Sequence, residues 1–461
     1  MTAINAVTDL SMDGDIAVIT LNSPPVNALS QAVREGLEAS FKQTLADPKV
    51  KGVVLICEGK TFVAGADIRE FGKPRKPPST KDFYKLLDAS TKPVVAAIHG
   101  TALGGGLELS MMCHYRVAVP SARCGLPEVN IGILPGGGGT QALPRIVGVE
   151  RALEMMTTGR HVPAKEAHEL GIFDALAPEG QLRAFAVDFT RKLIAENKPI
   201  KRVRDLNDKI DEARKHPEVF DKFRKANARR LRNMTAPENI IKCVEAAVAL
   251  PFDDGLKRET ELSQELHSGP QAPAMRHSFF AEREAAKIPD VPDTTEVLPV
   301  NSVGIIGAGT MGGGIAMNFA NVGIPVKIIE TKKEALERGL SVIRKNYERT
   351  AQRGGLTMDE VEKRMKLISG SLELGDLKDV DLIIEAIFER MDVKKDVFAK
   401  LDAVAKPGAI LATNTSGLNI DEIASATKRP ESVIGLHFFS PANVMKLLEV
   451  VRADHTSKAI I

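Results

Sequence analysis

Two glutamates and a run of glycines in the first third of the chain form a set that can move protons beside a carbonyl group. Gly104–Gly106 lead into a helical run, 107–113, that carries Glu108 in its first turn. Glycines at a helix N-terminus let backbone N–H groups approach an oxyanion closely. Glu128 follows in a second glycine-rich stretch. The set predicts that one carboxylate activates water, the other delivers a proton, and N–H groups hold an enolate.

A turn at Ala64–Asp67 supplies a second N–H donor to this set. It follows a β-rich run and contains a glycine. A purely structural role stays open for each part alone, because glycine loops commonly serve turns and isolated glutamates commonly face solvent. The combination is what favours chemistry.

A glycine fingerprint in the last third predicts a dinucleotide site. The strand-like run 303–306 is followed by Gly307, Gly309 and Gly312 in the order Gly-x-Gly-x-x-Gly and then by a helical run. The first glycine permits a tight turn, the second lets a pyrophosphate approach the helix N-terminus, and the third allows close helix-to-strand packing. Glu330 ends the next strand. Because a carboxylate there accepts ribose hydroxyls and repels a 2′-phosphate, we predict NAD rather than NADP.

His437 and Glu449 form a candidate general base and its partner. Each belongs to, or directly follows, a β-rich run. A carboxylate beside an imidazole fixes its tautomer and supports the imidazolium. A histidine beside a nicotinamide takes the proton of an alcohol as hydride leaves. The alternative is a structural histidine at a strand end.

The elements that position these residues predict an α/β fold. Short β-rich runs alternate with helical stretches in the first third and again after residue 300, where we expect a parallel, doubly wound sheet. The strand-like runs are 15–21, 50–57, 93–98, 302–306, 326–330, 380–385, 409–412, 433–436 and 447–451.

We expect four segments along the 461 residues. They are an α/β core at 1–195, a helical connecting segment at 196–286, a proline-rich linker at 287–299 and an incomplete nucleotide-binding domain at 300–461. The length agrees with a prior of about 150 residues per domain. The proline-rich linker is too poor in hydrogen-bond donors for a helix or a central strand.

The helical segment has a local excess of basic residues. Residues 198–232 hold 13 Lys and Arg against 6 Asp and Glu. One interpretation is a solvated helix surface, and the other is attraction of a phosphate-bearing ligand. Phe220 and Phe223 are its only aromatic residues, which argues against a surface that stacks nucleic-acid bases.

Composition excludes several classes of protein. With 62 Lys and Arg against 60 Asp and Glu, no global field attracts nucleic acid or a membrane surface. The four cysteines show no metal-ligand spacing, no apolar run is long enough to span a bilayer, and the N-terminus lacks the pattern of a secretory signal. We therefore expect a reduced protein without a metal, a nucleic-acid partner or a membrane insertion.

The motifs of the first third resemble the enoyl-CoA hydratase (crotonase) family. The resemblance rests on TFVAGADIREF at 61–71, PVVAAIHGTALGGGLELSMMC at 93–113 and GLPEVNIGILPGGGGTQALPR at 125–145. It implies that Glu108 and Glu128 flank the substrate double bond and that the N–H groups of Ala66 and Gly105 bind the oxyanion. It also implies a spiral of ββα turns that forms homo-oligomers, often trimers, and an acyl-CoA ligand.

The last third resembles the NAD-binding domain of the L-3-hydroxyacyl-CoA dehydrogenases. An NTS motif, an HFFSP motif and a glutamate 12 residues after its histidine match in type and spacing. The resemblance implies that His437 is the general base, that Glu449 is its partner, and that Ser416 binds the substrate hydroxyl. The residues that it places near the nicotinamide and its ribose are Glu385, Lys394 and Asn414.

The two halves in this order are similar to the multifunctional type 1 (peroxisomal-type bifunctional) family of fatty-acid β-oxidation enzymes and its bacterial relatives. This implies hydration of trans-2-enoyl-CoA, NAD-dependent oxidation of (3S)-3-hydroxyacyl-CoA in the complete protein, and 3,2-enoyl-CoA isomerase activity on the side. We expect the bacterial cytoplasm, with the peroxisome as the alternative. Only 24 residues follow His437, whereas that family continues with a helical domain that closes over the acyl chain. We therefore expect a fragment with impaired oxidation.

Two alternative hypotheses assign less catalytic activity to this chain. One is a CoA- or NAD-binding module without catalysis, and the other is a hydratase with an inactive dehydrogenase half. The presence of both Glu108 and Glu128 favours turnover, because a protein that only binds needs no acid pair. Replacing Glu108 by Gln would separate the hypotheses, since it should abolish hydration and spare ligand binding.

Overall fold

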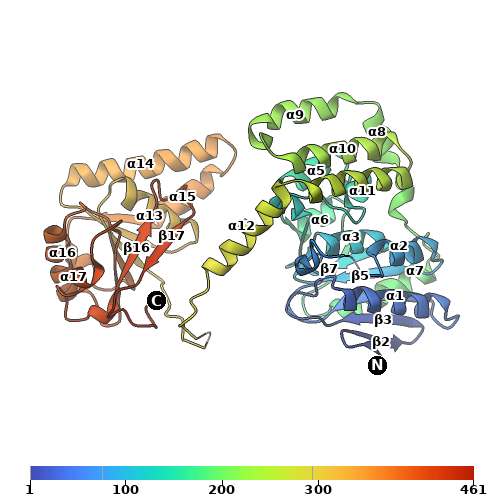
Figure 1. The fold of residues 1–461 in the computed structure, drawn as a ribbon, viewed down its shortest axis with the longest axis horizontal. Helices are drawn as coiled ribbons and strands as arrows, with labels where there is room; N and C mark the ends of the chain where they lie inside the picture. Colours follow the sequence, from blue (N-terminus) through green and yellow to red (C-terminus); the bar gives the residue numbers. More distant parts are fainter. Residues whose placement is uncertain (1, 75, 293) are drawn as a thin grey trace. The chain divides into compact units, whose positions relative to one another are not determined.

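The structure is a computed structural model that describes residues 2–74, 76–292 and 294–461. The chain divides into two compact units, Met1–Ala286 and Lys287–Ile461 (Figure 1). Residue 293 of the predicted linker at 287–299 lies outside the described residues. The segment 196–286, predicted as a connection, belongs to the first unit, because its apolar side chains join that unit's buried cluster.

The first unit is built on a seven-stranded sheet and a smaller three-stranded sheet. The large sheet has the order β1-β2-β3-β4-β5-β7-β10, and all pairings beyond β3 are parallel. The small sheet has the order β6-β8-β9. The strands are β1 (Thr2–Asn5), β2 (Thr8–Asp13), β3 (Ile16–Leu21), β4 (Gly52–Cys57), β5 (Val94–Ile98), β6 (Thr101–Leu103), β7 (Tyr115–Ala118), β8 (Arg123–Gly125), β9 (Val162–Pro163) and β10 (Ala175–Leu176).

Successive strands enter different sheets and are followed by a helix. β5 joins the large sheet, β6 joins the small one and α3 follows; β7 and β8 repeat this order before α4. This is the predicted ββα repeat. The helices are α1 (Gln31–Ala46), α2 (Thr80–Ala89), α3 (Gly105–Met112), α4 (Gly139–Val147), α5 (Val149–Thr158), α6 (Ala164–Glu169), α7 (Leu182–Ala195), α8 (Asp208–Arg214), α9 (Glu218–Leu231), α10 (Thr235–Ala249), α11 (Phe252–Ser268) and α12 (Gln271–Ala285), with 3-10 turns η1 (Ile68–Glu70), η2 (Pro127–Ile131) and η3 (Val203–Asp205).

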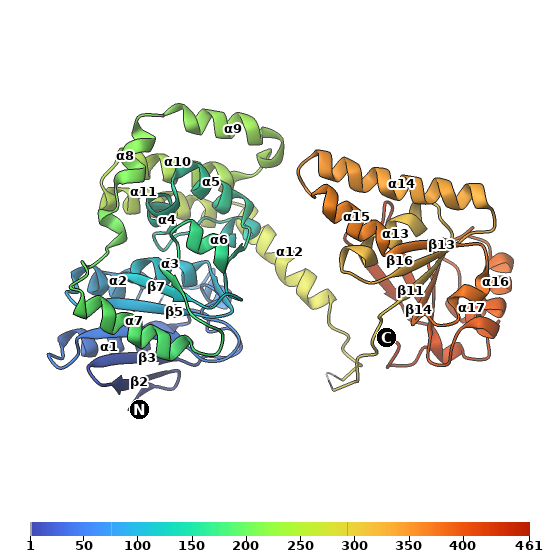
Figure 2. The ribbon, with the colours of Figure 1, turned by 180° about the vertical axis from the view of Figure 1, so that it is seen from behind.

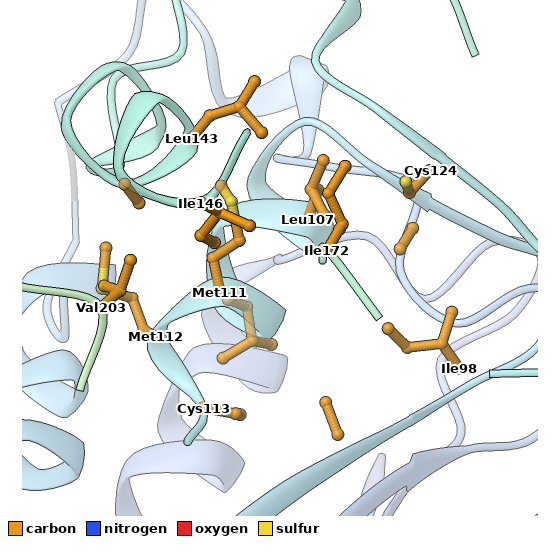
Figure 3. Packing of buried hydrophobic residues seen from close by; sticks show 14 of the residues in the cluster. Ile98, Leu107, Met111, Met112, Cys113, Cys124, Leu143, Ile146, Ile172 and Val203 are labelled. Atoms are coloured by element: carbon orange, nitrogen blue, oxygen red, sulfur yellow. The ribbon is translucent and has the colours of Figure 1, made fainter. Parts of the chain in front are cut away.

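One hydrophobic core holds the elements of this unit together. α7 lies across the large sheet, where it packs on β4 and β5 (Figure 2). Figure 3 shows Leu107 and Met111 of α3 close to Ile146 of α4 in the buried cluster. Ile240 of α10 and Leu262 of α11 belong to the same cluster. The helices that carry the candidate site are therefore fixed by close packing rather than by loops alone.

The second unit is a doubly wound sheet with the order β13-β12-β11-β14-β15-β16-β17. Ile305 and Ile306, neighbours on β11, belong to two separate buried clusters. Because successive residues of a strand point to opposite faces, both faces of the sheet are covered. The elements are β11 (Val303–Ile306), α13 (Thr310–Asn321), β12 (Val326–Ile329), α14 (Lys333–Gln352), α15 (Met358–Lys366), β13 (Ile368–Ser371), η4 (Leu374–Leu377), β14 (Leu382–Glu385), α16 (Met391–Val404), β15 (Ile410–Thr413), α17 (Ile420–Ala424), η5 (Pro430–Ser432), β16 (Val433–Phe438) and β17 (Leu448–Val451).

One strand departs from the predicted parallel sheet. β17 pairs with β16 in antiparallel orientation, and all the other pairings of this sheet are parallel. The connection at 439–447 contains no helix, and a parallel crossover needs a longer connection, usually with a helix. None of the described helices has the length and apolar character that a membrane span requires.

Candidate active site

Glu108 is a buried carboxylate held by two backbone amides. It lies in the first turn of α3, with 4% of its surface exposed. Its Oε1 accepts hydrogen bonds from the N–H groups of Gly137 (2.8 Å) and Gly139 (2.9 Å). Two N–H donors and the helix N-terminus both favour the ionised form. Glu108 is therefore suited to act as a base.

The glycines around Glu108 are needed because there is no room for a side chain at their positions. A Cβ atom on Gly137 would lie 2.5 Å from Oε2 of Glu108, and one on Gly139 would lie 2.8 Å from Oε1. These distances are shorter than any ordinary contact of a Cβ atom. The glycine-rich stretch found in the sequence thus allows the backbone to approach a carboxylate closely.

Glu128 is a second carboxylate, and its environment favours the protonated form. It lies in η2, and its Oε2 is buried without a hydrogen-bond partner among the described residues. Burial and then the nearby charge of Glu108 raise the pKa of Glu128 well above its ordinary value. A Cβ atom on Gly104, which precedes α3, would lie 2.9 Å from Oε1 of Glu128. The two predicted glutamates therefore lie close together at the start of α3.

The two predicted oxyanion donors are also neighbours. A Cβ atom on Gly105 would lie 3.5 Å from the backbone nitrogen of Ala66. Gly105 opens α3, and the first N–H groups of a helix have no acceptor within it. The chain pairs near Ala66 through the Leu29 N–H, which donates to the Gly65 carbonyl at 2.9 Å, so this hydrogen bond does not use the Ala66 amide. Two adjacent amides of this kind suit a developing negative charge on oxygen.

A third buried glutamate, Glu259, was not singled out from the sequence. It lies on α11, is 0% exposed, and accepts hydrogen bonds from the Gly138 N–H (2.9 Å) and the Thr140 hydroxyl (2.6 Å). Burial and then the charge of Glu108 raise its pKa to about 8. The sequence did contain a sign that Glu259 is buried, because it lies on the same helix face as the apolar Leu262 and Leu266.

In the second unit His437 and Glu449 form the predicted pair. The antiparallel register of β16 and β17 places them opposite one another, and His437 Nδ1 lies 2.7 Å from Glu449 Oε2. The histidine side chain is 21% exposed and the glutamate side chain 52%. A carboxylate at this distance orients the imidazole, which leaves Nε2 for proton transfer.

The NTS motif lies beside this pair. Asn414 Oδ1 accepts a hydrogen bond from the Phe438 N–H at 3.0 Å, which ties the motif to the end of β16. Ser416 is exposed, and its N–H donates to Glu389 Oε1 at 3.0 Å. Glu389 was missed in the sequence, although it is the second acid of the run IIEAIFER.

Glu385 and Lys394 form a buried ion pair. Both are 0% exposed, and Lys394 Nζ lies 2.9 Å and 2.7 Å from the two carboxylate oxygens of Glu385. The Thr413 hydroxyl and the Ile387 N–H also donate to Glu385. Both predicted cofactor contacts therefore form a buried ion pair at the carboxyl end of β14, and their contact with a nicotinamide stays a prediction.

The glycine fingerprint has the geometry that NAD requires. Gly307 has a φ of +103°, and a Cβ atom on Gly312 would lie 1.9 Å from the Gly307 carbonyl oxygen. Gly309 caps α13, and a Cβ atom there would meet no atom within 4 Å. Glu330 directly follows β12 and accepts from the Ala308 N–H at 3.1 Å. These residues therefore fit a dinucleotide. Gly307 makes the tight turn, Gly309 leaves room for the pyrophosphate, Gly312 allows close packing, and Glu330 can accept ribose hydroxyls.

Comparison with known proteins agrees with this geometry. Residues 11–248 match the family described as enoyl-CoA hydratase/isomerase, and residues 302–461 match 3-hydroxyacyl-CoA dehydrogenase, NAD binding domain. The chain is 44% identical over 450 residues to the peroxisomal bifunctional enzyme of Danio rerio and 42% identical over 456 residues to that of Homo sapiens. A solved structure of 3-hydroxybutyryl-CoA dehydrogenase from Escherichia coli is 42% identical over 35% of this chain and 34% of that chain, with a TM-score of 0.35.

The two sequence relatives are longer than this chain. The alignments cover 97% of this chain but 61% and 62% of the relatives. The two resemblances drawn from the motifs are confirmed by the family matches. The chain therefore belongs to the enoyl-CoA hydratase/isomerase family and carries, in its second unit, the NAD binding domain of the 3-hydroxyacyl-CoA dehydrogenases.

Proposed function

We propose that this chain hydrates trans-2-enoyl-CoA to 3-hydroxyacyl-CoA, as a step of fatty-acid β-oxidation. The observation that carries the proposal is the pair of Glu108, held by two amides, and Glu128, whose Oε2 is buried and whose pKa is raised. Water addition to a conjugated thioester needs a base and an acid together with an oxyanion site. The adjacent amides of Ala66 and Gly105 supply the last of these.

The reaction follows from these roles. Glu108 takes a proton from water as the water oxygen bonds to C3 of the substrate, and the thioester oxygen gains negative charge between the Ala66 and Gly105 amides. Glu128 then donates its proton to C2, which completes the 3-hydroxyacyl product. Proton exchange with solvent restores both carboxyl groups. An acid–base contribution of this kind accelerates a reaction by about 10²- to 10⁴-fold.

The same pair supports isomerase activity on the side. A carboxylate that takes a proton from one carbon and an acid that protonates a nearby carbon together move a double bond. Incubation with a 3-enoyl-CoA should yield the 2-enoyl isomer. Absence of that product with active hydratase would restrict the site to hydration.

For the second unit we propose NAD binding, with oxidation of (3S)-3-hydroxyacyl-CoA to 3-oxoacyl-CoA in the complete protein. Gly307, Gly309, Gly312 and Glu330 would hold the dinucleotide, which accepts a hydride when bound. His437, oriented by Glu449, would take the hydroxyl proton of the substrate. Ser416 would bind the same hydroxyl group.

A second candidate is that this chain hydrates and binds NAD without oxidising. The observation that favours it is the exposure of β17, where all of Leu448–Val451 face solvent. Water around the catalytic histidine weakens the electrostatic interactions on which hydride and proton transfer depend.

Partners and compartment are part of the proposal. We propose acyl-CoA as the small-molecule ligand and a homo-oligomeric state, to be tested by light scattering. The compartment was predicted as the bacterial cytoplasm with the peroxisome as the alternative. The names of the relatives from Danio rerio and Homo sapiens favour the peroxisomal alternative, and imaging in the native cell would decide between the two.

One assay tests the function directly. The chain is mixed with a short trans-2-enoyl-CoA and NAD, and the conjugated thioester absorbance and NADH are recorded together. We expect loss of the thioester signal, and no loss would favour a binding module without turnover. NADH formation would show that this chain also oxidises, which would reject the second candidate. Glu108→Gln should remove the thioester signal change and retain ligand binding.

A further inference from the structure

Glu259 is the most unusual group that the proposed reaction does not use. It is a fully buried carboxylate, and no ion pair is found for it among the described residues. An isolated buried carboxylate is costly to keep. Its two hydrogen bonds show what it holds: the amide of Gly138 and the hydroxyl of Thr140.

Glu259 and Glu108 share one backbone clamp. The amides of Gly137 and Gly139 donate to Glu108, and the amide between them, that of Gly138, donates to Glu259. Gly138 has a φ of +99°, and a Cβ atom there would lie 2.7 Å from Met112 Cε. The loop thus has little freedom, and the Glu259 carboxylate fixes its central amide through a hydrogen bond.

Glu259 comes from outside the part of the chain that was expected to hold the site. It lies on α11, in the segment 196–286, and α11 packs on α4, which directly follows the clamp. The half-buried Lys81 of α2 donates to Thr260, the next residue of α11, at 2.6 Å. The clamp is therefore held by a helix from a distant part of the sequence, because Glu259 lies 121 residues after Gly138.

Several titratable groups act on Glu259 or feel its charge. Glu108 of α3 raises the pKa of Glu259, and Lys81 of α2 lowers it. Its charge in turn raises the pKa values of three neighbouring groups from different elements: Glu128 of η2, Tyr84 of α2 and Cys243 of α10. Glu259 is therefore linked to the proposed catalytic pair both by hydrogen bonds and by charge.

We propose that Glu259 is a positioning residue of the hydration site: it holds the amide of Gly138, so that the neighbouring amides of Gly137 and Gly139 present Glu108. This inference rests on the proposed hydratase function. It makes the helical segment a part of the catalytic site rather than a connection between two sites.

The test compares three variants of the full chain with the unchanged protein. Glu259→Ala removes the clamp, and we expect kcat to fall by about 10- to 100-fold with KM changed by less than about 3-fold. Glu259→Gln keeps an acceptor for Gly138, so kcat near neutral pH should recover to within about 3-fold of the unchanged protein. The matched control is Glu261→Gln, an exposed residue of the same helix, which should change neither.

Two further readouts separate positioning from a merely structural role. The charge of Glu259 raises the pKa of Glu128, so the alkaline limb of the kcat profile of Glu259→Gln should move to lower pH. Hydrogen exchange at the amides of residues 136–140 should accelerate in Glu259→Ala and not in Glu259→Gln. The exchange measurement does not depend on catalysis.

The outcomes are distinct. Unchanged kcat and unchanged exchange in Glu259→Ala would overturn the clamp, and an unmoved alkaline limb in Glu259→Gln would overturn the electrostatic link between Glu259 and Glu128. If Glu259→Ala does not fold, Glu259→Leu, which fills a similar space without an acceptor for the Gly138 amide, takes its place in both measurements. If the unchanged protein does not hydrate but exchange still accelerates in Glu259→Ala, the proposed function fails and the clamp stands.

Discussion

The amide of Gly137 donates to Glu108 at 2.8 Å, and the same glycine leaves no room for a side chain, since a Cβ atom would lie 2.5 Å from the other carboxylate oxygen. Gly137 thus lies close to both carboxylate oxygens of Glu108. The position of the proposed base depends on a residue that has no side chain.

Gly137→Ala should displace the Glu108 carboxylate. Because a misplacement of about 1 Å can cost about 100-fold in rate, we expect hydration to fall by about that factor, measured as the loss of conjugated thioester absorbance. Gly136→Ala is the matched control, because the nearest atom to its Cβ would be the flexible Ser263 hydroxyl at 3.2 Å and the others would lie at ordinary contact distance. Equal activity in the two variants would contradict the assigned role of Glu108.

Glu128→Gln should remove the proton donor. We expect kcat to fall by about 10²- to 10⁴-fold, with binding of a saturated acyl-CoA unchanged by calorimetry, because the Gln side chain is nearly isosteric. Glu150→Gln, at an exposed position on α5, should behave as the unchanged protein. Retained hydration in Glu128→Gln would leave the acid unassigned.

Gly309→Ala should weaken NAD binding without unfolding the second unit. A Cβ atom at this position meets no protein atom within 4 Å, so thermal stability should be kept, but it obstructs the approach of a pyrophosphate to the helix N-terminus. We expect the dissociation constant to rise by about tenfold or more. Gly375→Ala, also without neighbours within 4 Å, is the control, and equal NAD affinity of both variants would argue against the proposed pyrophosphate position.

Lys394→Met should destabilise the second unit strongly. It leaves the Glu385 carboxylate buried without its cation, and such a break costs about 3–5 kcal/mol of unfolding free energy. The double variant Glu385→Gln with Lys394→Met should recover most of the loss. Lys395→Met, whose side chain is 39% exposed, should cost less than about 1 kcal/mol. Urea denaturation gives all three values, and a small loss in Lys394→Met would contradict a tight buried pair.

The stability of the first unit should depend on pH through Glu259. Its pKa is raised from 4.5 to about 8 in the folded state, so between these values the folded state holds a proton that the unfolded state releases. Stability from this group is therefore complete at acidic pH and is lost as pH rises towards 8. Relative to Glu259→Gln, the unfolding free energy of the unchanged protein should fall over this window. A difference that stays constant with pH would show that the carboxyl titrates normally.

Strand prediction succeeded for β3, β4 and β5, whose residues are nearly all buried, and missed β7, which is also largely buried. The run of β3 is apolar except for Thr20, and all six of its residues are buried, which is typical of a central strand. The edge strands β1 and β13, and β2 beside β1, were not predicted, because their mixed polar residues give no continuous apolar run. The antiparallel direction of β17 also escaped, since a strand pattern carries no direction.

The sequence by itself determined the local chemistry: the glycine turns, Glu108 at the start of its helix, the dinucleotide fingerprint and the two families. These depend on residues within one turn, strand end or helix start, where backbone geometry follows from nearby residue types. Only the tertiary structure decided that Glu259 joins Glu108 on a shared clamp, that Glu385 is enclosed by Lys394, and that Glu389 reaches Ser416. The reason is physical: the two partners in each of these contacts come from different elements, and packing, not spacing, brings them together.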